Sequence, residues 1–591
     1  MPDNTRKEIE DTLASDNGEN KVLDLKDAVA RYVKPGMQLH MGDACNGILR
    51  EIIRQYRGQK PGFTLVGTSA RDAAVDLVHC GLAKKLIVGA AAESYPQQGL
   101  SRIMQRASKE QKLEIESWTL LTIFERLMAG AMGISFLPTK SVLGTSMAQA
   151  NKEAFREIAD PFGGSQTLGA VKAINPDLSL VHAWAADPHG NVVFAPEVWS
   201  GGQTMWGAFA SKGGALVTVE KLLSTEQLRQ YQSMVKIPGY IVKSVSVVPF
   251  GAHPQPLGNP AVPGLPSYSA DYDFFTEHRV ASRKPETLNE WLDKWVFSCP
   301  APEDYLRKLG YDRILSLRGK AQAGNAQARL EACSDKLETD SPANSTELMV
   351  LAAAAKMTEA VQKNNLKIIL TAIGTAALAS YISFYNLKRS GYPIEIAGGT
   401  GIYGFTPPMG DPHLWYDIGS LLPACKMLTD SFISYGVFVA GNPRSCVSIM
   451  GAGQIDKYGN GNSTRAPDGS YLVGSGGAGD AAMAPVVFLL ARQSTDRFVD
   501  KVSYITFPGS NVKALISDKG IFEKPEGSDE LVLTGYFRRE KLSRDEIVVD
   551  IKQTCGWELK VASRLSEAPA PNKQDLLLMR MMDPAGFFRG E

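Results

Sequence analysis

The sequence is poor in the residues that form the disulfide bonds of small secreted proteins or bind metal ions. Its 591 residues include seven cysteines and seven histidines, and no two cysteines form a Cys-x-x-Cys pair. An odd, scattered set of cysteines argues against a disulfide framework and a structural zinc site. Neither a His-x-x-His pattern nor a carboxylate cluster with metal-ligand spacing occurs, so we expect no bound metal.

The chain also lacks net charge and long apolar runs. It carries 63 lysines and arginines against 63 aspartates and glutamates, so electrostatics favours neither nucleic acid nor an acidic membrane surface as a partner. No run of about 18 apolar residues occurs, and the first residues are polar. We therefore expect a cytoplasmic protein that binds neither nucleic acid nor membrane.

A short acid-x-x-Gly-Asn segment is present twice, at 187–191 and 456–460. Each copy follows an apolar, β-branched run, and glycine and asparagine tolerate positive φ, so each segment predicts a tight turn at a strand end. A helix, a turn, a strand and a glycine also occur in the same order at 23–42 and 351–374. The repetition predicts two copies of one fold, joined by duplication or gene fusion.

The chain divides accordingly into four segments. We predict a polar arm at 1–22, a first domain at 23–318, a linker poor in apolar residues at 319–346 and a second domain at 347–591. Within each domain, apolar strands alternate with amphipathic segments, which is typical of an α/β fold with a largely parallel sheet. We predict two homologous open parallel-sheet domains in tandem.

Two stretches, 399–404 and 474–479, satisfy the Gly-x-Gly-x-x-Gly fingerprint of dinucleotide sites. That fingerprint requires a helix to begin inside the glycines. Pro407 and Pro408 prevent this after the first stretch, and a strand begins soon after the second, so a nicotinamide or flavin is not expected. The glycines instead allow close approach of a ligand, and 474–479 could present N–H groups to an oxyanion or a phosphate. A plain tight turn is the alternative.

Taken together, these segments resemble the family I coenzyme A transferases, most closely the glutaconate CoA-transferase group. In that family two homologous subunits each form an open α/β domain, and the active site lies between them. The first half resembles the α-type subunit, whereas the second half resembles the β-type subunit, fused here in one chain. The matching segments are 136–138, 144–146, 181–191, 249–254 and 290–297 in the first half, and 453–464 and 474–478 in the second.

The resemblance implies an enzyme whose substrate is a coenzyme A thioester, with no further cofactor. A carboxylic acid would be the second substrate, and the sequence leaves open whether two chains pair as a homodimer. The resemblance further implies contacts of substrate or CoA with one set of positions: Gly398, Gly399, Gly474, Ser475, Gly476, Gly477, Ala478, Ser146 and His253. For His253, a structural role is the alternative, since a lone histidine is more often structural than catalytic.

The chemistry of the family depends on a glutamate at the end of a buried strand in the β-type half. It attacks the acyl-CoA and forms a glutamyl-CoA thioester, from which a second acid takes the CoA. The segment matching its Val-Glu-Ser-Gly pattern is 394–399, and ungapped alignment places Ala397 at the nucleophile position. Glu395, two residues earlier on the same strand face and ~7 Å back, is the displaced candidate. A salt bridge or a rim position is the alternative for Glu395.

If Glu395 is not the nucleophile, a different reaction is implied. Relatives of this fold without the glutamate look like decarboxylases or cofactor-free hydrolases of CoA thioesters that carry a carboxylate or a β-oxo ring. Such reactions need an acid or base and an oxyanion hole. The candidates are Glu114 and Glu116, which share one strand face, and Glu93; each is otherwise a solvated surface charge.

The sequence therefore supports three hypotheses of function. Transfer of CoA between an acyl-CoA and a carboxylic acid ranks first. Cofactor-free hydrolysis of a C–C or thioester bond, or decarboxylation, of a CoA-linked dicarboxylate or cyclic β-oxo acid ranks second. A non-catalytic acyl-CoA binder ranks third.

Overall fold

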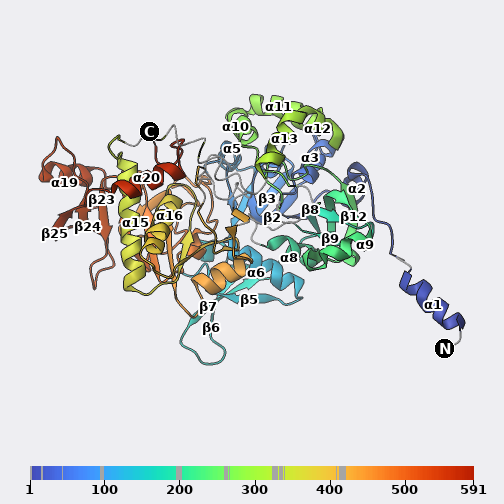
Figure 1. Cartoon of the computed structure of the whole chain (residues 1–591), viewed down its shortest axis with the longest axis horizontal. Coiled ribbons are helices and arrows are strands. Elements are labelled where there is room, and N and C mark those ends of the chain that lie inside the picture. Colours follow the sequence, from blue (N-terminus) through green and yellow to red (C-terminus); the bar gives the residue numbers. More distant parts are fainter. Residues whose placement is uncertain are drawn as a thin grey trace.

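The structure is a computed structural model of the whole chain, organised around two large sheets (Figure 1). It describes residues 3–14, 18–42, 44–93, 99–194, 202–258, 264, 267–321, 331, 337, 340–407, 409–410, 421–422 and 424–590. In Figure 1 the first sheet and its helices occupy the right side and the second sheet the left, while the N-terminal helix α1 (Asp3–Ala14) lies apart from both.

The first half is built on a nine-stranded sheet. Its order is β11-β9-β8-β1-β2-β3-β4, with β10 beside β8 and β12 beside β10. Only the pairings of β9 with β8 and β11 are antiparallel. The strands are β1 Gln38–Met41, β2 Phe63–Ala70, β3 Ala83–Ala91, β4 Glu114–Ser117, β8 Leu178–Ala186, β9 Val192–Val193, β10 Ala215–Leu222, β11 Val235–Ile237 and β12 Val242–Val247. Every residue of β8 is buried, as expected of a central parallel strand.

Helices and a small three-stranded sheet surround this sheet. The small sheet consists of β5 Phe136–Thr139, β7 Thr167–Lys172 and β6 Phe155–Ala159. The helices are α2 Leu25–Tyr32, α3 Asn46–Gln55, α4 Ala73–His79, α5 Arg102–Lys109, α6 Leu120–Ala131, α7 Ser146–Ala150, α8 Gln203–Ala210, α9 Thr225–Leu228, α10 Tyr272–Ala281, α11 Pro285–Leu292, α12 Pro302–Leu309 and α13 Tyr311–Lys320. Polar caps set several starts: Ser101 accepts from the Met104 N–H at α5, and Thr119 forms a capping box with Thr122 at α6.

The second half is built on a ten-stranded sheet in the order β16-β15-β14-β13-β17-β20-β22-β23-β24-β25. The run from β14 to β22 is parallel, and antiparallel strands flank it on both sides. The strands are β13 Ile368–Thr371, β14 Glu395–Gly398, β15 Ile402–Tyr403, β16 Met427–Leu428, β17 Cys446–Met450, β20 Val486–Leu490, β22 Val512–Ile516, β23 Gly520–Glu523, β24 Val532–Tyr536 and β25 Val561–Glu567.

The remaining elements of this half cover the sheet and its edges. A small sheet contains β18 Gln454–Asp456, β19 Gly461–Asn462 and β21 Phe498–Val499. The helices are α15 Ser345–Lys363, α16 Thr375–Arg389, the π-helix η4 Phe432–Val439, α18 Ala478–Ala481, α19 Arg544–Gln553 and α20 Lys573–Met582. Helices α15 and α16 pack on the sheet through one apolar cluster that includes Met357, Ile382 and Ile396.

The two sheets confirm the predicted fold class, an α/β protein with two largely parallel sheets in tandem. The repeated segments at 187–191 and 456–460 adopt the same turn. In each, the aspartate Oδ1 accepts from the asparagine N–H, at 2.9 Å from Asp187 to Asn191 and 3.0 Å from Asp456 to Asn460. The predicted domain limits stay a prediction, because much of the linker 319–346 lies outside the described residues.

Among the described helices, none combines the length and the apolar character that crossing a membrane requires.

Candidate active site

A glycine-rich turn of the second half, residues 474–479, lies against the carboxyl end of β3 in the first half. The N–H of Gly476 donates to the carbonyl of Gly89 over 2.9 Å, and the N–H of Ala91 donates to the carbonyl of Val473 over 2.9 Å. Open α/β sheets bind ligands at the carboxyl ends of their parallel strands. The contact between the halves therefore coincides with the edge of the sheet where a ligand is expected.

Only glycine fits the closest point of this contact. Gly474 has φ +105°, and a Cβ atom there would lie 2.5 Å from the carbonyl oxygen of Gly89. The turn also presents a donor: within the part of the chain that the structure describes, the N–H of Gly477 donates to no acceptor. That N–H can hydrogen-bond an oxygen atom of a ligand.

Tyr435, on η4, links this turn to the end of β14. A Cβ atom added at Gly399 would lie 1.8 Å from its Oη, and one added at Gly477 would lie 1.9 Å from it. The phenol thus fills the space into which side chains at 399 and 477 would project. Burial, and after it the charge of Asp480, raises the pKa of Tyr435, so the phenol stays protonated at neutral pH and acts as a hydrogen-bond donor.

Two buried carboxyl groups from different halves lie beneath the turn. The Oδ1 of Asp480 accepts from Ser141 Oγ over 2.6 Å, and its Oδ2 accepts from the N–H of Leu121 over 3.0 Å. Burial raises the pKa of Asp480 to about 6, although these two hydrogen bonds lower it. Burial also raises the pKa of Glu125 on α6 well above its ordinary value, and the charge of Asp480 adds to this. Both groups can hold a proton near neutral pH.

Comparison with known proteins shows which family this chain resembles. Residues 22–247 match the family model described as coenzyme A transferase. This chain is similar to members of the coenzyme A transferase family. It is similar to both subunits of glutaconate CoA-transferase from Acidaminococcus fermentans. The first of these two proteins is 29% identical over 322 residues, covering 51% of this chain and 95% of its own length. The second is 28% identical over 163 residues, covering 24% of this chain and 59% of its own length.

Two further relatives broaden the comparison. The IpdA subunit of a cholesterol ring-cleaving hydrolase from Rhodococcus jostii is 28% identical over 177 residues, covering 29% of this chain and 56% of the relative. An acyl-CoA transferase structure from Escherichia coli O157:H7 superimposes with a TM-score of 0.61 at 15% identity, covering 95% of this chain and 96% of that one. Similarity to two separate subunits, together with a fold match over nearly the full length, agrees with a fusion of α-type and β-type subunits.

Glu395, the predicted displaced nucleophile, lies at the start of β14, whereas Gly398 is its last residue. The Glu395 carboxylate accepts from Lys426 Nζ over 2.6 Å and from Lys388 Nζ over 3.5 Å. Three residues of strand separate it from Gly398 by ~10 Å. Ala397, between them, is fully buried. Glu395 therefore forms an ion pair at the amino end of β14, whereas Gly399 and Tyr435 lie at the carboxyl end of this strand.

The predicted acid–base candidates Glu114 and Glu116 lie together on β4, an edge strand, and both pair with Lys85, at 2.8 and 2.7 Å. Glu116 also accepts from Arg126 Nη1 over 2.9 Å and from Trp118 Nε1 over 2.8 Å. Burial acts to raise the pKa of Glu116, but Arg126, Lys85 and Trp118 together lower it. Glu116 is thus held as a carboxylate within an ion-pair network.

Of the remaining predicted positions, Ser146 lies at the contact between the halves and His253 lies away from it. The Ser146 Oγ accepts from the Ile505 N–H over 2.8 Å. His253 is fully buried, and its ring nitrogens lie 2.7 Å from Tyr305 Oη and 2.9 Å from Asp271 Oδ2. Burial lowers the pKa of His253 to about 4, so the ring is neutral.

Ser475 and Ala478 close the glycine-rich turn. The Ser475 carbonyl accepts from the Ala478 N–H over 2.9 Å, and its Oγ accepts from the Gly479 N–H over 3.3 Å. The turn is therefore rigidified from within. No sequence pattern indicates Tyr435, Glu125 or Asp480, because segments far apart in the chain bring them together.

Proposed function

We propose that this chain converts an acyl-CoA thioester, by hydrolysis or decarboxylation, through acid–base chemistry without a glutamyl-CoA intermediate. The observation that carries the proposal is the end of β14. Gly399 follows the strand there, and the phenol of Tyr435 occupies the space that a side chain at 399 would need. The nearest glutamate on that strand, Glu395, is held by Lys426 at its other end.

The groups around the turn suit such a reaction. Both hydrolysis and decarboxylation of a thioester place negative charge on the carbonyl oxygen, and hydrogen-bond donors stabilise that charge. Tyr435 Oη and the Gly477 N–H are neighbouring donors, and neither has to change protonation state to donate. Asp480, with a pKa of about 6, can hold or release a proton at physiological pH. No cofactor beyond the CoA of the substrate is needed.

CoA transfer to a carboxylic acid is the second candidate. It is supported by the similarity to both subunits of glutaconate CoA-transferase. The similarity to the IpdA hydrolase protein supports the first candidate, hydrolysis or decarboxylation. The two candidates differ in their requirements: transfer needs an acceptor acid and a covalent intermediate, whereas hydrolysis needs only water.

The test is to incubate the enzyme with a panel of CoA thioesters in ¹⁸O-labelled water, with and without acceptor acids. Borohydride is added to trap any enzyme thioester for peptide mass spectrometry. We expect consumption without an acceptor and no reduced adduct, with ¹⁸O in the released acid for hydrolysis or CO₂ release for decarboxylation. Tyr435→Phe should lower kcat, and Glu395→Gln should not. Acceptor-dependent consumption with a reduced adduct at Glu395 would establish transfer instead.

A further inference from the structure

Two buried carboxyl groups from opposite halves of the chain, Glu125 and Asp480, meet beneath the glycine-rich turn. Asp480 lies at the amino end of helix α6, where its Oδ2 accepts from the Leu121 N–H over 3.0 Å. Glu125 follows four residues later on the same helix, a little over one turn of ~5.4 Å. Because the side chains of a helix lean toward its amino end, that of Glu125 points back toward Asp480. The charge of Asp480 accordingly acts on Glu125.

The segment after strand β5 also connects the two groups. Ser141 Oγ donates to Asp480 Oδ1 over 2.6 Å, and the Ser141 N–H donates to Thr139 Oγ1 over 3.0 Å. The Thr139 hydroxyl in turn hydrogen-bonds Glu125. Thr119 Oγ1 lies 3.0 Å from Ser141 Oγ and fixes its position. Two neighbouring residues of the first half therefore hold both carboxyl groups in place.

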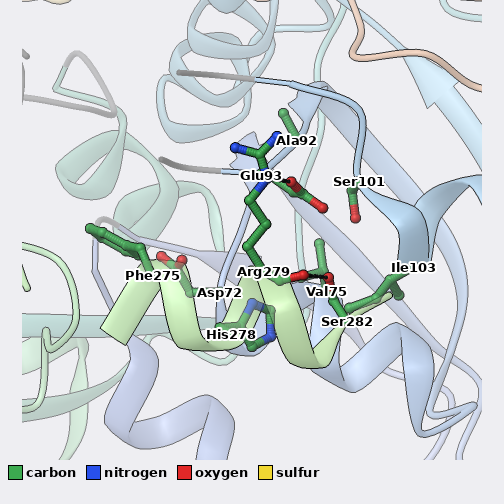
Figure 2. Close-up of a pocket in the computed structure, with 10 residues that line it drawn as sticks. All are labelled: Asp72, Val75, Ala92, Glu93, Ser101, Ile103, Phe275, His278, Arg279 and Ser282. Atoms are coloured by element: carbon green, nitrogen blue, oxygen red, sulfur yellow. Dashed lines mark hydrogen bonds and ion pairs between the residues drawn. The ribbon is translucent and has the colours of Figure 1, made fainter. Parts of the chain in front are cut away.

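No positive charge balances this pair. Among the described residues, neither Glu125 nor Asp480 has an ion-pair partner. Glu125 is 3% exposed and Asp480 is fully buried, and in the same part of the chain Glu125 Oε2 has no hydrogen-bond partner. Glu93, just after β3, differs because its carboxylate pairs with Arg279 over 2.8 Å (Figure 2). Two buried carboxylates without a cation repel each other and lose their hydration, so one of them keeps its proton.

The other charged groups on the neighbouring elements bond elsewhere. Arg126, the next residue of α6, pairs with Glu116 over 2.9 Å. Lys140 Nζ donates to a backbone carbonyl of the second half over 3.2 Å. Asp430, before η4, accepts from a backbone N–H of that helix over 2.9 Å. The phenol of Tyr435, on η4, stays protonated at neutral pH. The two carboxyl groups themselves therefore determine the charge beneath the turn.

We infer that Glu125 and Asp480 share one proton at neutral pH, which Glu125 holds as a carboxylic acid while Asp480 is a carboxylate. When the reaction delivers a further proton, an O–H bond forms on Asp480 and the bond of that proton to its donor breaks. Release of the proton to water restores the carboxylate. Glu125 is a positioning residue, since its neutral form leaves Asp480 as the single buried charge of the pair. The role in turnover rests on the proposed function, whereas the shared proton can be measured without turnover.

The first test is the pH dependence of stability, measured by scanning calorimetry between about pH 4 and pH 9. The proteins are the wild type, Glu125→Gln, Asp480→Asn and the double variant, with Glu290→Gln as the control. Glu290 is an exposed glutamate on α11. Glutamine and asparagine keep the shapes of the two carboxyl groups but cannot ionise.

The expected result follows from the protonation of Glu125. Burial raises its pKa well above the ordinary value, against the hydrogen bond from Thr139, and the charge of Asp480 adds to the increase. The unfolded chain releases this proton above about pH 4.3 and the folded chain keeps it, so the wild type loses stability as the pH rises from there. The Tm of Glu125→Gln relative to the wild type should therefore increase by about 2–4 °C for each pH unit. With Asp480→Asn present, the pKa of Glu125 is lower and the increase should end at a lower pH. Glu290→Gln should show no such increase.

Infrared spectroscopy of the same proteins detects the proton directly. At about pH 8 exposed carboxyl groups are ionised, so the wild type should keep a C=O band from a buried, protonated carboxyl group. Glu125→Gln should lose that component, and Glu290→Gln should keep it. An unchanged band in Glu125→Gln would overturn the inference. So would a Tm difference between Glu125→Gln and the wild type that stays constant with pH, or strictly additive effects of the two substitutions at every pH.

The pH profile of kcat/KM separates this inference from the proposed function. For an acyl-CoA that the enzyme converts, kcat/KM should change near about pH 6 as Asp480 ionises, and again at higher pH as Glu125 ionises. Glu125→Gln should remove the second change and keep the first. If no acyl-CoA is converted, the proposed function fails, while the calorimetric and infrared results still decide whether the proton is shared.

Discussion

The contact of Tyr435 with Gly399 makes a quantitative prediction. Gly399→Ala places a methyl group at a position 1.8 Å from Tyr435 Oη, 2.2 Å from its Cζ and 2.9 Å from its Cε1. Non-bonded carbon atoms prefer separations of about 3.5–4.0 Å, so the ring must move by more than an ångström. Tyr435 is 6% exposed and packs in the apolar core of the second half, so this movement disturbs its neighbours.

The cost follows from overpacking. Forcing extra volume into a packed core typically costs about 1–3 kcal/mol. Tyr435→Leu removes the ring atoms that the new methyl group would meet, so Gly399→Ala should cost much less in that background. The double variant should therefore be more stable, by about 1 kcal/mol or more, than the sum of the two single effects predicts. For a domain of this size, each kcal/mol corresponds to about 2–4 °C in apparent Tm.

Scanning calorimetry of the four proteins of the cycle tests this prediction. We expect Gly399→Ala alone to lower the apparent Tm of the transition to which the second half contributes, and the decrease to be smaller with Tyr435→Leu already present. Gly436→Ala, one residue from Tyr435, is a matched control, because no atom lies within 4 Å of a Cβ added there. Strictly additive effects of the two substitutions would refute the proposed contact.

Three further predictions concern ionisable groups. The pKa of Asp480 is raised to about 6, from about 3.9 in an unfolded chain, so stability should fall as the pH rises from 4 to 6, by about 3 kcal/mol. Asp480→Asn should remove this decrease in stability between pH 4 and pH 6. The Tm of the variant and of the wild type are compared across this range, and a difference that does not change with pH would contradict the prediction. Glu395→Gln should lower the free energy of unfolding by less than about 1 kcal/mol, because the pair with Lys426 is partly exposed. The same substitution should leave kcat/KM for acyl-CoA unchanged. A hundredfold decrease in kcat/KM would instead support Glu395 as the nucleophile. Arg126→Met should lower the free energy of unfolding, measured with denaturant, by about 3–5 kcal/mol, because the half-buried Glu116 carboxylate loses its arginine partner. Adding Glu116→Gln should restore much of this free energy.

The sequence predicts what depends on local hydrogen bonds and side-chain pattern. The turns at 187–191 and 456–460 are predictable because each is closed by its own aspartate, within five residues. The alternation of apolar strands and amphipathic helices likewise predicts the two largely parallel sheets. The close approach of a ligand expected at 474–479 stays a prediction; the structure shows the backbone of Gly89, from the other half, packed against this turn.

The candidate site is less predictable because its parts meet only after folding. The contact at Tyr435 joins Gly399 and Gly477, which lie in separate segments of the second half. Glu125 and Asp480 have no sequence signal, since a glutamate in an amphipathic helix and an aspartate after a glycine turn are usually exposed. Their raised pKa values arise from burial at the contact of two halves, which no local pattern encodes.

The hydrogen bonds between the turn 474–479 and β3 mean that neither half alone can form the candidate site. In an enzyme made of two separate chains, completion of such a site depends on the concentration of both partners. Here the second half is always present at the high local concentration set by the connecting chain. Dilution should therefore leave the specific activity of the intact chain unchanged, whereas a chain cut within 319–346 would become sensitive to dilution wherever its two parts separate.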